Sequence, residues 1–188
     1  MKKILLIFQI IIAIFICNGC GTWTEKDKTT NISDYSKYFG QDGKHNNYIF
    51  PYSIPNSSKV ENFCYYYYNP FDKNYVSYLV YSCNDEDYTK EIERLSKIKS
   101  SEDYLIYSAS GFNYPLCSVY ADDYGYIYAL TDKENKKLIY VEIKFCNYFS
   151  DIDYENIIDK KYLPIDFNAK SGNPTRKAFE RNHLKNSK

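Results

Sequence analysis

Aromatic and β-branched side chains dominate two neighbouring stretches of the chain, residues 60–68 and 75–83. Side chains of this kind favour strands. The six residues that separate the stretches, Asn-Pro-Phe-Asp-Lys-Asn, are typical of turns. The pattern therefore predicts a β-hairpin.

Directly after this hairpin the period of the apolar positions changes from that of a strand to that of a helix. Tyr88, Ile92, Leu95 and Ile98 recur at intervals of three and four residues. Acidic residues fill the first turn, and Asn84 or Asp85 can cap it. We predict one long helix here.

Further strands are predicted downstream, separated by residues typical of turns. They cover residues 103–108, 116–120, 124–131 and 138–146. Ser150 and Asp153 then resemble a capping box that opens a short helix. The expected fold class is α+β: a single domain over residues 48–166, with a mainly antiparallel sheet of five to seven strands, one long helix and one short helix.

Both flanks of this domain lack apolar periodicity. Residues 20–47 are polar and are expected to form a flexible tether. Residues 167–188 hold six Lys or Arg and one Glu, and are expected to form a disordered basic tail. Such a tail either attracts anionic lipid or wall polymers or is simply solvated.

The first nineteen residues have the pattern of an export signal. Lys2 and Lys3 precede an apolar run from Ile4 to Cys17 that is interrupted only by Gln9. A helix that spans hydrocarbon needs about 20 apolar residues, and this run is shorter. We therefore expect a cleaved signal rather than a spanning anchor.

The end of this signal, Ile16-Cys17-Asn18-Gly19-Cys20, resembles the lipobox of bacterial lipoproteins. The resemblance implies that Cys20 is diacylated and becomes the new N-terminus. It also implies lipid anchoring on the extracytoplasmic face of the bacterial cell membrane, because two acyl chains suffice for stable anchoring. Residues 22–188 resemble small lipoproteins of uncharacterised role in general character, which implies no activity.

Charge and motifs exclude several classes of function. Lys plus Arg and Asp plus Glu each number 24, so the chain has no net positive charge to hold nucleic acid. The sequence contains no phosphate-binding, dinucleotide-binding, esterase or zinc-protease motif, and we expect no cofactor.

Catalytic residues are equally hard to find. The two histidines, His45 and His183, both lie outside the predicted domain, so neither is expected to serve as a base or a metal ligand. Carboxylates such as the Asp122–Asp123 pair could act in a hydrolase, but nothing in their spacing indicates that they do.

The cysteines leave two interpretations open. Cys64 and Cys83 lie on consecutive predicted strands and are the first candidates for a disulfide. Alternatively, the cysteines of the domain are small buried hydrophobic residues.

The chain contains 23 tyrosines, and strand parity suggests where some of them lie. If Leu130 pairs with Leu138, then Tyr128 lies opposite Tyr140, and both share the face of Glu142. That face is expected to meet water, because Glu142 is charged. The result is an exposed tyrosine ladder, formed by Tyr124, Tyr126, Tyr128 and Tyr140.

Such a ladder could bind sugar rings, peptides or protein partners. The competing interpretation is that the tyrosines only stabilise the sheet. We expect a non-enzymatic binding or structural lipoprotein, whose partners are the lipid membrane and a cell-wall glycan or surface protein. The first alternative is a cell-wall-associated hydrolase that uses carboxylates. A third possible function is protection against an external toxin or lytic enzyme.

Overall fold

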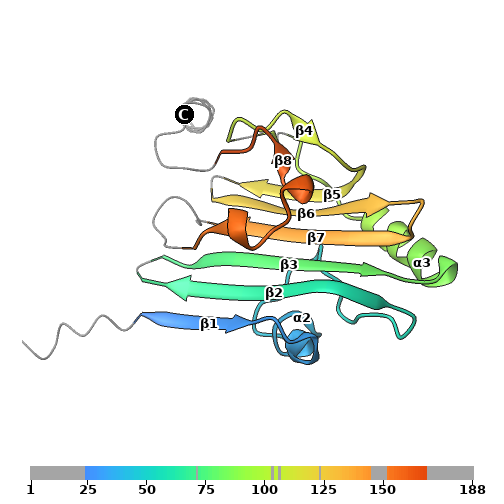
Figure 1. Cartoon of the computed structure of the whole chain (residues 1–188), viewed down its shortest axis with the longest axis horizontal. Helices are drawn as coiled ribbons and strands as arrows, with labels where there is room; N and C mark the ends of the chain where they lie inside the picture. The colour runs from blue at the N-terminus through green and yellow to red at the C-terminus, as the bar shows by residue number, and fades with distance from the viewer. Residues whose placement is uncertain are drawn as a thin grey trace, which may run out of the picture.

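The computed structural model confirms a single-domain α+β fold (Figure 1). It describes residues 24–70, 72–102, 104–105, 107–122, 124–144 and 152–168. The signal, Cys20 and all but the first two residues of the basic tail lie outside these ranges. Among the residues described, no helix is long and apolar enough to cross a membrane.

Six antiparallel strands form the main sheet, in the order β1-β2-β3-β7-β6-β5. They are β1 (Glu25–Thr29), β2 (Lys59–Asn69), β3 (Asn74–Ser82), β5 (Leu116–Asp122), β6 (Gly125–Asp132) and β7 (Lys137–Lys144). The long pairing of β2 with β3 confirms the predicted hairpin. A second sheet has two strands, β4 (Gly111–Phe112) and β8 (Pro164–Ile165).

The predicted long helix is α3 (Asp85–Ser96). Its N-cap is Asn84, whose side chain accepts a hydrogen bond from the Asp87 amide at 2.8 Å. Tyr88 and Leu95 are buried against the sheet, as the apolar period predicted.

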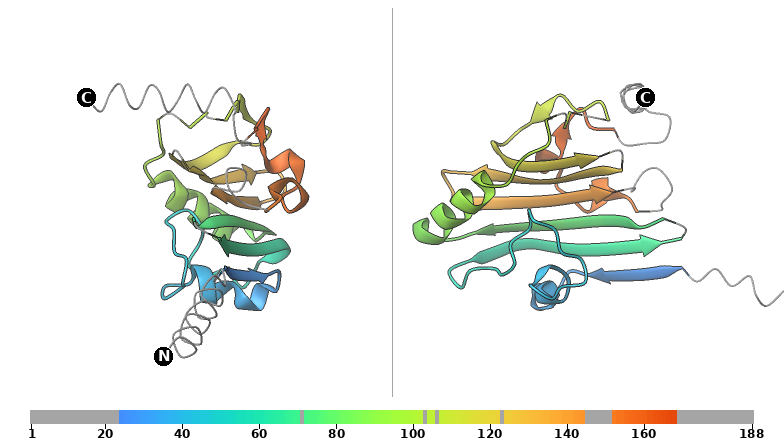
Figure 2. Two further views of the ribbon diagram at one scale, coloured as in Figure 1. Left: turned by 90° about the vertical axis from the view of Figure 1, so that its left-hand side faces the viewer. Right: turned by 180° about the vertical axis from the view of Figure 1, so that it is seen from behind.

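Both faces of the sheet are covered (Figure 2). One face packs against α3, against α2 (Tyr35–Phe39) and against the chain that follows α2; we call it the α3 face. The other packs against the segment after β7, which includes the 3-10 helices η2 (Tyr154–Asn156) and η3 (Lys160–Tyr162), and we call it the C-terminal face. The short helix predicted after Ser150 is therefore one turn of 3-10 helix, capped by Asp153.

The prediction of a tether over residues 20–47 is wrong for the part that the structure describes. β1 pairs with β2 from Glu25 to Thr29 and forms an edge of the sheet. Tyr35, Tyr38 and Phe39 are buried. These aromatic side chains have helical spacing, but the pattern covers only five residues and so does not give a sustained period; one short helix, with a 3-10 turn (Ile32–Asp34) before it, is enough to bury them.

The predicted register of β6 with β7 is also wrong, by one residue. Leu130 pairs with Ile139 rather than with Leu138, and Tyr128 lies opposite Val141. A four-residue turn between Asp132 and Lys137 sets this register, with Lys136 in the left-handed region at φ 49°.

Gly125 favours the same register at the other end of the pair. Its φ is +142°, and a Cβ atom there would lie 1.9 Å from the Ile143 carbonyl oxygen. Only glycine allows the two strands to approach this closely.

The strand predicted over residues 103–108 is absent from the described part of that segment. Tyr107 and Ser108 both have left-handed φ values, 55° and 67°. The side chain of Tyr107 is buried on the C-terminal face, where Phe167 also packs, so the domain extends to the start of the predicted tail.

Candidate binding site

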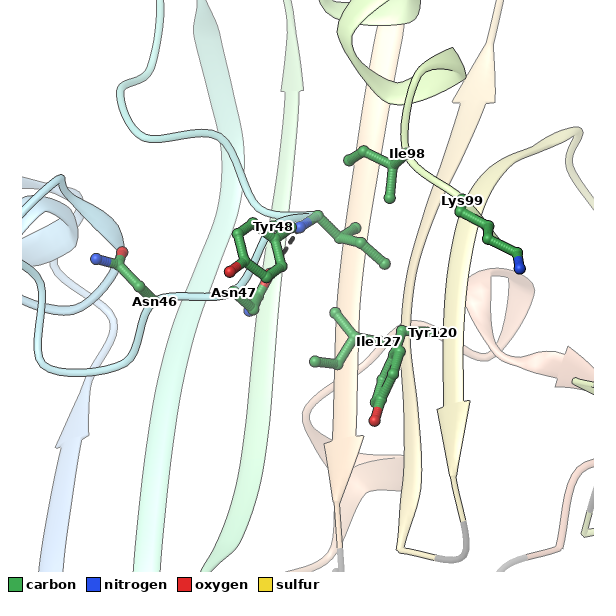
Figure 3. A pocket seen from close by; sticks show the side chains of 8 residues that line it. Asn46, Asn47, Tyr48, Ile98, Lys99, Tyr120 and Ile127 are labelled. Carbon is green, nitrogen blue, oxygen red and sulfur yellow. Dashed lines mark hydrogen bonds between the residues drawn. The ribbon is translucent and has the colours of Figure 1, made fainter. Parts of the chain in front are cut away.

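An open pocket of about 350 Å³ lies on the α3 face, where three segments meet (Figure 3). These are the loop after α2, the end of α3 and the strands β5 and β6. The lining residues are Asn46, Asn47, Tyr48, Ile49, Ile98, Lys99, Tyr120 and Ile127. Ligand sites in proteins are typically concave and mainly apolar, with a few polar groups. This pocket has the same character.

The loop that forms one wall is shaped by Asn47. Its Oδ1 accepts hydrogen bonds from the backbone amides of Ile49, at 3.1 Å, and Phe50, at 2.8 Å. Ile49 and Phe50 are buried beneath this turn, whereas Tyr48 at its tip is 81% exposed. The turn therefore presents one aromatic ring to solvent from a firmly packed base.

Arg94 of α3 holds the same loop from the side. Its guanidinium donates to the carbonyl oxygens of Tyr48, at 2.8 Å, and Ile49, at 2.6 Å. Glu91 accepts two further bonds from this guanidinium and one from the hydroxyl of Tyr140, at 2.5 Å. The Arg94 guanidinium thus joins the loop to α3, because it donates hydrogen bonds both to the loop carbonyl oxygens and to Glu91.

The floor and the opposite wall come from the sheet and the end of α3. Tyr120 and Ile127 are direct partners across β5 and β6. Tyr120 is 49% exposed, and the Lys144 ammonium lies 5.2 Å from its ring centroid. Ile98 and Lys99 lie just beyond Lys97, the C-cap of α3, and the exposed Lys99 forms no ion pair with any carboxylate in the described part of the chain.

Next to the pocket, the His45 ring contacts the carboxylate of Glu142 of β7. Its Nε2 lies 2.8 Å from Oε1 and 2.7 Å from Oε2 of the carboxylate. The Ser77 hydroxyl donates to the same carboxylate at 2.8 Å. Glu142 is fully buried, and the imidazole ring stacks on Tyr75 with the ring centroids 4.0 Å apart.

The prediction that His45 lies outside the domain is therefore wrong. His45 precedes Asn46 and Asn47 in the pocket wall, and Glu142 lies directly across β6–β7 from Ile127 in the pocket floor. The pair fixes the loop to the sheet at this point.

This Ser-Glu-His cluster is not arranged for nucleophilic catalysis. In a catalytic triad the serine hydroxyl donates to the histidine, which removes its proton. Here the Ser77 hydroxyl donates to the carboxylate, and the histidine contacts the carboxylate alone through Nε2. We interpret the cluster as structural.

The predicted tyrosine ladder is not a surface. Tyr126 and Tyr128 are fully buried on the C-terminal face, and the Tyr128 hydroxyl donates to the Tyr162 carbonyl oxygen at 2.8 Å. Tyr140 is fully buried on the α3 face, and only Tyr124, at 50%, is well exposed. Burial, together with Tyr81 and Glu91 nearby, raises the pKa of Tyr140 well above its ordinary value.

The predicted disulfide between Cys64 and Cys83 is contradicted as well. Cys64 lies opposite Tyr78 in the hairpin, whereas Cys83 follows Ser82 at the far end, where β3 pairs with Lys59. The two side chains also pack on opposite faces of the sheet. Both thiols are free, as is that of Cys117.

Sequence reasoning missed the residues that do form the pocket. Tyr48, Lys99 and Tyr120 come from three distant segments, and no local pattern joins them. The one usable signal was Asn46-Asn47 before the apolar Ile49-Phe50, which is typical of a turn that leaves Tyr48 at its tip.

Comparisons with known proteins give no relative for this arrangement. No protein-family model matches the chain, and no curated protein or solved structure shows significant similarity to it. In the part of the chain that is described, no cluster of three or more His, Cys, Asp or Glu side chains could hold a metal ion.

Proposed function

We propose that this chain is a non-enzymatic binding module, anchored by a diacylated Cys20 on the extracytoplasmic face of the bacterial membrane. The observation that carries the binding role is the pocket on the α3 face. Two exposed tyrosine rings flank it, and tyrosine gives a large contact area at a low cost in conformational entropy.

The polar side chains in and beside the pocket support binding rather than catalysis. No carboxylate lines the pocket, so a hydrolase that uses carboxylates would need a different site. His45 and Glu142, next to the pocket, bind each other and hold the loop. Protection against a toxin would also be a binding role, but no residue in the pocket points to such a partner.

The anchoring part of the proposal rests on the N-terminal pattern. Lys2 and Lys3, the apolar run and Gly19-Cys20 together have the pattern of a lipoprotein signal. Mass spectrometry of the membrane-extracted protein should find a diacylglyceryl group on an N-terminal Cys20. An intact Met1 terminus on the wild-type protein would contradict lipidation, and Cys20→Ala serves as the unmodified reference.

The binding part is tested by titrating the full chain, in mild detergent, with fragments of cell-wall glycan. We expect saturable binding that Tyr120→Ala weakens by about tenfold, as truncation of an aromatic hot spot does. Tyr52→Ala is the matched control, because Tyr52 is 52% exposed and does not line the pocket. Release of new reducing ends from the glycan would instead favour the hydrolase.

A further inference from the structure

The polar groups around the pocket point to the chemical class of its ligand. We infer that the pocket binds an organic anion that carries a single ring, with the ring between Tyr48 and Tyr120 and the negative charge at Lys99. This inference rests on the proposed binding function and goes beyond it by naming the ligand class.

The size of the pocket limits the ligand to a small group. Its volume of about 350 Å³ is near the lower end of the range for ligand pockets, about 300 to 1,000 Å³. One six-membered ring with a short substituent therefore fills it better than an extended chain does.

The shape of the lining favours a ring. Tyr48 and Tyr120 come from different segments and stand at the pocket (Figure 3), and both residues are exposed, Tyr48 at 81% and Tyr120 at 49%. Ile98 and Ile127 lie between these segments and offer only apolar contact. A ring with an apolar face can contact the tyrosines and the isoleucines together.

The charge of the lining favours an anion. Lys99 is the single charged residue that lines the pocket, and it forms no ion pair in the described part of the chain. A cation in the pocket wall without an ion-pair partner favours a ligand that carries a negative charge.

The neighbouring charges do not cancel this preference. Asp122 is bound to Lys144 at 3.0 Å, and Glu91 is bound to Arg94 at 2.6 Å. Glu142 is fully buried and bound to His45. Each of these three carboxylates is thus bound to a basic side chain of its own, whereas Lys99 forms no ion pair in the described part of the chain.

Two sources can supply such an anion: a free aromatic acid and an acidic sugar of the cell wall. Each has a neutral counterpart of nearly the same shape. The test compares phenylacetate with phenylacetamide, and N-acetylmuramate with the amide of its lactyl carboxyl group, by calorimetric titration of the full chain at low ionic strength.

We expect at least one anion to bind about fivefold more tightly than its neutral counterpart, which is the range for a partly exposed charge pair. Lys99→Gln should abolish that preference, whereas Lys97→Gln, an exposed lysine two residues away, should retain it. Added salt should weaken binding of the anion alone. The pair that shows the preference identifies the source.

Equal binding of anion and neutral counterpart, with Tyr120→Ala still weakening both, would overturn the inference and leave the binding function standing. A preference that survives Lys99→Gln would overturn it in the same way. Absence of binding by all four compounds would also overturn it, and binding of wall-glycan fragments then decides the proposed function separately.

Discussion

The most consequential residue in the domain is Glu142, a fully buried carboxylate in the middle of the sheet. Because Glu142 is charged, the sequence predicted that its face of β7 meets water. The structure instead satisfies this charge with His45, which is 97 residues away in the sequence, and with Ser77 of the neighbouring strand. A partner so distant leaves no local signal, so the sequence alone could not show that a charged position belongs to the core.

We predict that His45→Ala lowers the free energy of unfolding by about 3 to 5 kcal/mol, because it leaves Glu142 buried with only a hydroxyl partner. The double variant His45→Ala/Glu142→Gln should recover part of the loss. Denaturant unfolding measures both.

The control for this prediction is Lys90→Ala, which breaks an exposed ion pair with Glu86. Exposed pairs contribute less than about 1 kcal/mol. If His45→Ala costs no more than Lys90→Ala, the buried pair does not hold the loop.

Tyrosine hydroxyl groups give a second prediction, at alkaline pH. Burial, and then the hydrogen bond to Asp27, raises the pKa of Tyr38 to about 12; burial also raises the pKa of Tyr75 to about 12, from an ordinary value of 10.0. The folded protein therefore favours the protonated form. The stabilisation is complete below pH 10.0 and is lost as the pH rises towards about 12.

Tyrosinate absorbance and the free energy of unfolding, measured together against pH, test this sign. The last tyrosines should ionise only as the protein unfolds. A smooth titration of all tyrosines near pH 10.0 in a protein that stays folded would contradict the burial of Tyr38 and Tyr75.

At the scale of elements, the sequence predicted what depends on local pattern. The β2–β3 hairpin and α3 were predicted because strand propensity, turn residues, helical period and capping agree over neighbouring residues. The register of β6 with β7 was not, because the sheet is buried on both faces. Tyrosine at buried positions on both faces removes the alternation between apolar and polar residues on which parity depends.

The segment formed by β1 and α2 gives a prediction at this scale. Phe39 is 1% exposed, and Phe39→Ala should cost about 3 to 5 kcal/mol of stability. Ile32→Ala, in the same segment but 36% exposed, should change stability by about 0.5 kcal/mol or less. Denaturant unfolding compares the two variants.

Limited proteolysis tests the same segment independently. Residues 25–39 should resist cleavage for as long as the sheet does, since β1 is paired along its length. A protease that removes residues 24–47 and leaves a stable fragment from residue 48 onward would restore the tether hypothesis.

For the whole molecule, the position of β1 near Cys20 limits how far the domain can lie from the membrane. Four residues separate Cys20 from the first residue of β1, Glu25. An extended chain covers at most about 3.6 Å per residue, so β1 can start no further than about 18 Å from a lipidated Cys20. Under the proposed anchoring, the domain lies at the membrane surface rather than on a long tether.

A nitroxide label on β1, at Lys26→Cys, should therefore relax strongly when a paramagnetic agent is added to the lipid. A label on the opposite edge of the sheet, at Tyr124→Cys beside β5, should respond less. Equal and weak responses at the two positions would show that the domain is held well away from the bilayer.

Isoleucine methyl groups report directly on ligand binding in the pocket on the α3 face. Ile49, Ile98 and Ile127 line the pocket, whereas Ile139 and Ile143 lie on the C-terminal face. We predict that wall-glycan fragments or the preferred ring-bearing anion shift the first three methyl resonances with one common saturation curve, and leave the other two unchanged. Shifts confined to the C-terminal face, or no shift in any of the three lining isoleucines at saturating ligand, would show that the ligand does not bind in this pocket.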